Sequence, residues 1–208
     1  MARFASLAGI SAQIGYKRHP GRYGGKPAVV ADNTLDRQFE VDAPDKVWVT
    51  DITYIRMHEG WSYLAVVIDL FSRRVVGWMF YWCAIWEWGA VLSTVWRRKP
   101  KHRVMIHSDQ GSQFTGKKWQ SFLSKHNLDA SMSRRRNCHN NAVAESFFQL
   151  LKRERIRRRT YLTRDAARHD VFDYIEMFYN PTRKHTNNGM LSPVDYEMKQ
   201  QKMNEPGV

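Results

Sequence analysis

The chain of 208 residues carries 33 lysines and arginines against 20 aspartates and glutamates, which gives a formal charge of +13. A composition of 43% hydrophobic and 25% charged residues excludes a disordered or fibrous protein, and the length is ample for a proper core. Two cysteines, Cys83 and Cys138, exclude a disulfide framework, and the basic excess favours a polyanionic partner such as nucleic acid.

The first part of the chain, residues 1–44, is predicted to be a basic arm containing Gly and Pro. Residues 1–31 hold no acid, and Lys17, Arg18 and Arg22 are candidate DNA contacts. The alternative is a solvated tail, because a run of charge alone specifies little. Residues 1–20 do not show the pattern of a secretory signal, so we expect a cytoplasmic protein. A core is expected over 45–200 and a tail over 201–208.

Three runs with strand character follow the arm. They predict an antiparallel meander with short turns, at 47–55, 61–70 and 73–82. A helix is expected over 84–96. The apolar stretch Val75–Trp96 is also long enough for a membrane span, but Glu87 would then lie near its costly centre. A buried strand followed by a buried helix gives the same stretch, and we expect no membrane partner.

The second half of the chain alternates strands with helices. The expected elements are a strand over 103–108, a helix over 116–126, a strand over 128–132, and helices over 141–157 and 163–179. Thr163 can cap the last of these, Asp165 lies in its first turn, and Pro181 ends it. Ser192 and Pro193 can begin a short terminal helix. Strands followed by alternating helices and strands predict a mixed α/β layer.

Three acids stand out in this pattern. Asp51 interrupts an apolar strand, where an unpartnered carboxylate is costly; its simpler interpretation is a strand-edge residue paired with solvent or a lysine. Asp109 ends a strand, where α/β folds place ligands, although it can equally cap the next turn. Helical periodicity places Glu145 with Asn141, Gln149 and Lys152, opposite an apolar face of Val143, Phe147 and Leu150. Periodicity alone therefore favours an exposed Glu145.

Three blocks, VTDITYI, HSDQGSQF and NNAVAESFFQLLKRE, closely resemble the DDE transposases of bacterial insertion sequences, in the class encoded by a second reading frame. Asp109 and Glu145 are separated by 35 residues, the spacing of that integrase-type core. Lys152 matches the basic residue that follows the acid in this family. DYIEMFYNPTRKH and LSPVDYE resemble its C-terminal stretch, so the resemblance runs from about Ile10 to Glu197.

The resemblance implies a ribonuclease H-like fold with a mixed five-stranded sheet and a triad of Asp51, Asp109 and Glu145. Two divalent ions, Mg²⁺ or Mn²⁺, would be shared by the three carboxylates, with Asp51 bridging them. The implied reaction is metal-dependent cleavage of transposon ends and strand transfer into target DNA. The implied DNA-binding residues are Lys152, Arg153, Arg155, Arg134, Arg135 and Asn141, with the arm residues Lys17, Arg18 and Arg22. Asp69 is expected to be structural, and His107 to have a packing role.

The chain also departs from the family pattern. Asn140 replaces an acid, Arg136 replaces a glycine, and the segment Tyr81–Ala90 is unusually aromatic. Met1 stands within what should be the end of a helix-turn-helix region, so a separate upstream-frame protein is a possible partner. Self-association on DNA at the bacterial nucleoid is also expected. A decayed DNA-binding remnant and a structure-selective nuclease stay open as alternatives.

Overall fold

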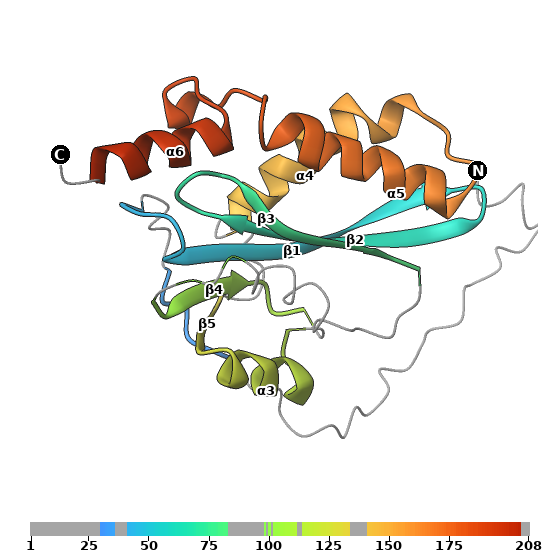
Figure 1. Cartoon of the computed structure of the whole chain (residues 1–208). Helices are drawn as coiled ribbons and strands as arrows, with labels where there is room; N and C mark the ends of the chain where they lie inside the picture. The colour runs from blue at the N-terminus through green and yellow to red at the C-terminus, as the bar shows by residue number, and fades with distance from the viewer. Residues whose placement is uncertain are drawn as a thin grey trace, which may run out of the picture.

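The computed structural model describes residues 30–35, 41–82, 98, 100, 102–111, 114–133 and 141–204. A five-stranded sheet with the order β3-β2-β1-β4-β5 forms its centre (Figure 1). The strands are β1 (Val47–Met57), β2 (Gly60–Asp69), β3 (Val75–Tyr81), β4 (Val104–Ser108) and β5 (Leu128–Met132). β1, β2 and β3 run antiparallel, whereas β4 is parallel to β1 and β5 is parallel to β4. All five predicted strands and the mixed α/β class are confirmed.

The hairpin of β1 and β2 fixes the register of the sheet. The pairing runs from Trp48 opposite Asp69 to Met57 opposite Gly60. Gly60 adopts a φ of +109°, which residues with a side chain rarely adopt, so glycine suits this turn. With β2 on one side and β4 on the other, β1 is an interior strand.

Helices cover both faces of this sheet (Figure 1). They are α3 (Lys117–Lys125), α4 (Ala142–Glu154), α5 (Arg164–Phe172) and α6 (Pro193–Asn204). Alternation along β1 divides its side chains between two apolar layers. Val49 and Ile55 pack in the layer that contains Phe147 of α4, whereas Trp48 packs with Trp119 of α3. α4 therefore lies over the face of the sheet that carries the odd-numbered residues of β1.

The long helix predicted from Thr163 has the predicted limits but two geometries. The Thr163 hydroxyl accepts a hydrogen bond from the Ala166 amide at 3.2 Å, and α5 begins at Arg164. From Asp173 to Tyr179 the chain continues as a π-helix, η3. A 3₁₀ turn, η2 (Ile156–Arg158), follows α4, and a second one, η4 (Thr186–Asn188), precedes α6.

Part of the predicted arm belongs to the core. Leu35 is buried, and its amide donates a hydrogen bond to the Ser131 hydroxyl at 3.2 Å. The Thr34 amide donates to the same oxygen at 3.1 Å, which ties this segment to β5. Thr34 and Leu35, which lie within the expected arm, therefore pack against the core. At the other end, α6 continues to Asn204, beyond the expected limit of 200.

Several predictions lie outside the described residues. These are the helix over 84–96 with Glu87, most of the aromatic segment 81–90, the arm residues Lys17, Arg18 and Arg22, and the loop residues Arg134, Arg135, Arg136 and Asn140. The start of the apolar stretch, Val75–Tyr81, is strand β3 paired with β2. Within the described ranges, none of the helices has the length and apolar character to cross a membrane.

Candidate active site

Asp51 lies in the middle of β1, on the face that α4 covers. It is partly buried, and in the sheet register it stands opposite Val66 of β2. Its Oδ1 accepts a hydrogen bond from the Ile52 amide at 2.7 Å. The interior strand thus fixes the position of this carboxylate.

Asp109 reaches the same face from the end of β4. The parallel register pairs Val49 with His107, so Asp51 and Asp109 each lie two residues beyond the last paired positions. Because side chains alternate along a strand, both point to the face of the sheet that α4 covers. The Asp109 Oδ1 accepts a hydrogen bond from the Gly111 amide at 2.8 Å, which fixes the turn after the strand.

α4 brings Glu145 over this edge, and the exposed orientation expected from periodicity is wrong. Glu145 and Lys152 are both partly buried. The buried side of α4 includes Phe148, which lies on the same side of the helix as these two residues. The apolar face is therefore rotated relative to the expected one; its buried members are Ala144, Phe147, Phe148 and Leu151. Glu145 borders the contact with the sheet instead of pointing away from it.

The electrostatics join these four side chains into one site. Burial, with the charges of Asp109 and Glu145 adding to it, raises the pKa of Asp51 to about 7, while the hydrogen bond from the Ile52 amide and the charge of Lys152 oppose the rise. Burial lowers the pKa of Lys152, and the Asp51 carboxylate opposes that shift. The predicted acids and the lysine are therefore close enough to interact, although they come from three separate elements.

The chemistry of the three carboxylates fits a hard divalent cation, which prefers oxygen ligands. The charges of Asp109 and Glu145 raise the pKa of Asp51 because the three carboxylates repel one another. A bound cation would relieve this repulsion, so the electrostatics of the site also fit a metal ion. In the part of the chain that the structure describes, no three His, Cys, Asp or Glu side chains are arranged tightly enough to hold a metal ion. The carboxylates thus interact through charge without forming a ready coordination shell.

Two buried polar side chains border the site. Asn141, predicted to bind DNA, is 5% exposed, and its Nδ2 donates to the Thr50 carbonyl at 3.5 Å. Its Oδ1 has no partner among the described residues. Asn141 thus links the start of α4 to β1. His107 is fully buried, with its Nδ1 2.9 Å from the Ser131 hydroxyl, and burial lowers its pKa to about 4. This agrees with a packing role.

Some of the basic side chains that follow Glu145 on the chain are exposed to solvent, and others bind acidic side chains of the protein. Arg153 is 67% exposed. Arg155 and Arg159 instead bind the buried Asp170, at 3.4 Å and 2.6 Å, and the Tyr161 hydroxyl donates to the same carboxylate at 2.5 Å. The guanidinium of Arg155 is therefore engaged within the protein, a contact that nothing in the local sequence indicates.

Asp69 is structural, as expected. It is fully buried, and its carboxylate accepts hydrogen bonds from the amides of Asp45 and Phe71 at 2.7 Å and 2.9 Å. Burial raises its pKa to about 6. Its neighbours include Arg98, which binds the carboxylates of Asp45 and Glu197 at 2.6 Å and 2.7 Å.

The chain is similar to several known proteins. The family description "Integrase core domain" matches residues 41–138 and again residues 145–201. The transposase InsF for insertion sequence IS3A of Escherichia coli is 41% identical over 193 residues, which are 92% of this chain and 67% of that protein.

Two solved structures share the fold. The first is a chain of the simian T-cell lymphotropic virus intasome in complex with PP2A regulatory subunit B56 gamma. Its TM-score is 0.64 at 13% identity, and the match covers 89% of this chain and 63% of that one. The second is the catalytic core domain of HTLV-2 integrase in complex with magnesium, with a TM-score of 0.54 at 16% identity. That match covers 74% of this chain and 97% of that one.

Proposed function

The chain belongs to the transposases of insertion sequences whose catalytic core is of the integrase, ribonuclease H-like type, and from this membership we propose a specific activity. The protein cuts DNA at transposon ends and joins the freed 3′ ends to target DNA, using Asp51, Asp109 and Glu145. The observation that carries this proposal is the mutual charge interaction of Asp51 with the other two acids and with Lys152.

The three carboxylates have distinct roles in this proposal. Asp51, whose carboxyl group interacts electrostatically with both other acids, would be shared by two Mg²⁺ or Mn²⁺ ions. Asp109 and Glu145 would each hold one of these ions. Such a pair of ions stabilises the charge on the attacking and leaving oxygens of a phosphodiester. The chain's own contribution is to fix the carboxylates from an interior strand, a strand end and a packed helix.

Lys152 would hold a DNA phosphate beside the carboxylates. The Asp51 carboxylate favours the charged form of Lys152, against the burial that disfavours it. Arg153, which is exposed, would bind the backbone further along. We extend the DNA-binding surface to Arg134 and Arg135 and to the arm residues Lys17, Arg18 and Arg22, and we assign Asn141 to positioning α4.

The family also suggests how the protein works with others. The matched intasome is a viral assembly, and on that likeness we propose that this chain self-associates on paired DNA ends. An upstream-frame protein would supply sequence-specific recognition. The reaction would take place in the bacterial cytoplasm, on the nucleoid, and the domain division would be a DNA-binding arm followed by the catalytic core.

A strand-transfer assay tests the catalytic assignment. Wild-type protein and Glu145→Gln are incubated with a pre-cleaved DNA end and target DNA, in Mg²⁺ and in Mn²⁺. The variant keeps the shape of the side chain but loses its charge, so the joining rate should fall by on the order of 10²–10³, as when a group that stabilises transition-state charge is removed. Glu176→Gln, the same change at an exposed glutamate, should leave the rate unchanged.

Other outcomes identify other functions. A Glu145→Gln variant as active as wild type contradicts the proposed triad. Wild-type protein that is folded and binds DNA with a steep salt dependence, yet joins nothing in either metal, is the decayed remnant. Cleavage of branched DNA without joining indicates a nuclease.

A further inference from the structure

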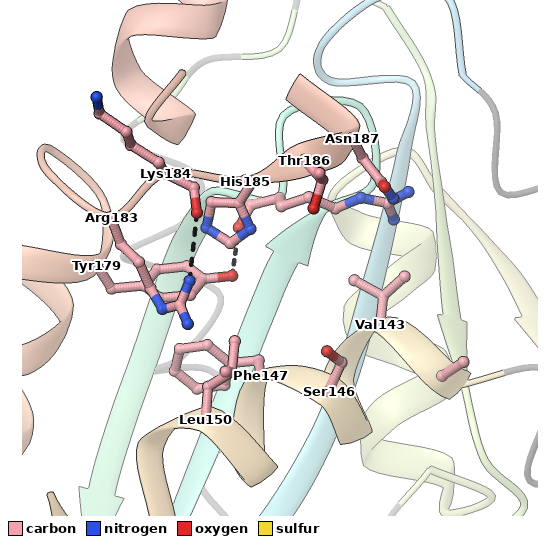
Figure 2. Close-up of a pocket in the computed structure, with 12 residues that line it drawn as sticks. Val143, Ser146, Phe147, Leu150, Tyr179, Arg183, Lys184, His185, Thr186 and Asn187 are labelled. Atoms are coloured by element: carbon pink, nitrogen blue, oxygen red, sulfur yellow. Dashed lines mark hydrogen bonds between the residues drawn. The ribbon is translucent and has the colours of Figure 1, made fainter. Parts of the chain in front are cut away.

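A cavity of about 440 Å³ lies on the other side of α4 from Glu145. Val143 lines the cavity, and at about 100° per residue it is turned roughly 200° away from Glu145 around the helix axis. The opposite wall is the segment Arg183–Asn187 that leads into η4. In Figure 2, Ser146 and Phe147 of α4 face His185 and Thr186 of that segment across the cavity.

The polar part of the lining is basic. Arg73, from the turn between β2 and β3, joins Arg183 and Lys184 around the cavity. Hydroxyl and amide groups complete the polar lining: Ser146, Thr186 and Asn187. Among the described lining residues there is no aspartate or glutamate. The cavity therefore concentrates positive charge and hydrogen-bond donors.

Of the three cations, Arg183 alone forms a salt bridge with a carboxylate in the described part of the chain. Arg183 binds Glu154, which lies outside the lining, at 2.7 Å. The Nη1 of Arg73 is buried and has no hydrogen-bond partner in the described part of the chain. A buried guanidinium nitrogen without an acceptor is costly, so the cavity has an unmet demand for an acceptor.

His185 adds a second unmet donor or acceptor. Its Nε2 is also buried without a partner within the described ranges. Burial, followed by the charges of Arg183 and Arg73, lowers its pKa to about 4, so the ring is neutral at physiological pH. A neutral imidazole can donate one hydrogen bond to an anion without needing a counter-charge.

Contacts among the residues around the cavity hold its walls in place. The Tyr179 hydroxyl donates to the Arg73 carbonyl at 3.1 Å, and its ring packs edge-on against His185 at 5.1 Å. The Asn188 Nδ2 donates to the Ser72 carbonyl at 2.7 Å, which fixes η4 beside the turn that carries Arg73. These contacts preorganise the segments that carry Arg73 and His185.

We propose that this cavity binds a phosphate group through Arg73, Lys184 and His185. The apolar side chains of Val143 and Leu150 on α4 form a surface against which a sugar ring can pack, as it would for a phosphodiester of a DNA strand. Free inorganic phosphate offers the same oxygens. The DNA source rests on the proposed function, and it adds a second DNA contact on the side of α4 away from the carboxylates.

Two binding measurements on the full chain test this proposal. All proteins carry Glu145→Gln, so the result does not depend on catalysis. The first measurement is the slope of log affinity against log salt for a fluorescent DNA duplex. The second is the rise in thermal midpoint caused by inorganic phosphate, compared with chloride at equal ionic strength. The variants are Arg73→Gln and Lys184→Gln, and Arg168→Gln, at an exposed α5 arginine outside the lining, is the control.

If DNA occupies the cavity, Arg73→Gln and Lys184→Gln each lower the salt slope by about one, whereas the control leaves it unchanged. If free phosphate occupies it, the two variants lose the phosphate-induced rise in midpoint and keep the slope. Unchanged slope and unchanged phosphate response in both variants overturn the proposal. Should Arg73→Gln fail to fold, the exposed Lys184 decides the result. Failed strand transfer by wild-type protein bears only on the proposed catalytic function.

Discussion

Replacing Asp51 by asparagine should raise the stability of the metal-free protein at neutral pH, although it removes a proposed catalytic group. Burial, with Asp109 and Glu145 adding to it, raises the pKa of Asp51 to about 7 from its ordinary 3.8. The folded state therefore holds this proton more tightly than the unfolded chain does. The neutral carboxyl contributes its whole stabilisation below pH 3.8, and this stabilisation is lost as the pH rises through about 7.

The expected size follows from the two pKa values. At about 1.36 kcal/mol per pKa unit, the rise of the pKa from 3.8 to about 7 lowers the free energy of unfolding of the wild-type protein by ~4 kcal/mol above pH 7. Asparagine has nearly the same shape and no charge, and its carboxamide oxygen can still accept the Ile52 amide. Asp51→Asn should therefore unfold at higher urea than wild type at about pH 8, with the difference vanishing toward low pH.

The measurement is urea denaturation of both proteins in a chelator from about pH 5 to about pH 8.5. The difference between the two curves isolates Asp51, because Asp69, whose pKa burial raises to about 6, titrates in both proteins. Asp173→Asn, at an exposed position, is the matched control and should show no such pH-dependent difference. A wild-type-minus-variant difference that stays constant across this range refutes the reasoning. Added Mg²⁺ should then stabilise wild type but not Asp51→Asn.

Three further predictions concern the scaffold. Phe147, at 1% exposed, lies 4.9 Å from the Tyr179 ring, so Phe147→Ala should lower the free energy of unfolding by ~3–5 kcal/mol in urea titrations. Phe172→Ala, which removes a ring that is 44% exposed, should lower the free energy of unfolding clearly less than Phe147→Ala does. Equal losses for the two variants would contradict the packing of α4. Thr163→Ala should cost ~1 kcal/mol by circular dichroism melting because the Ala166 amide loses its acceptor, with Thr163→Ser near wild type. Arg98→Met should lower the free energy of unfolding by ~1–3 kcal/mol by calorimetry, because the buried carboxylate of Glu197 loses a partner at 2.7 Å and keeps only Arg74 and Ser72; no measurable loss would rule out this role.

The sequence predicted the strands well because their signals are local. Alternating and apolar runs separated by turn residues define β1, β2 and β3, and the structure confirms their order and pairing. The spacing of Asp109 and Glu145 also indicated a shared site. That prediction came from the resemblance to a family and not from the expected geometry of the strand and the helix. The first of the expected short turns lies at Gly60.

Other features depend on contacts between distant segments. The rotation of α4 toward Glu145 is set by Phe148, which the sheet buries and which simple periodicity assigned to no face. Arg155 was predicted to bind DNA, but Asp170, fifteen residues further on, binds its guanidinium. The donors around Arg73 come together only when η4 packs beside the β2–β3 turn. None of these contacts has a local sequence signal.

The interior position of β1 bears on local unfolding and on hydrogen exchange with solvent. Its residues around Thr50 pair with β2 on one side and lie next to β4 on the other, and the Thr50 side chain donates to the Val66 carbonyl at 2.9 Å. Amide hydrogens on such a strand exchange with solvent only in the largest, rarest openings, whereas helix ends and turns exchange in small ones. Asp51 thus lies on a strand whose amides should exchange slowly, and we expect it to keep its place when helix ends and turns open.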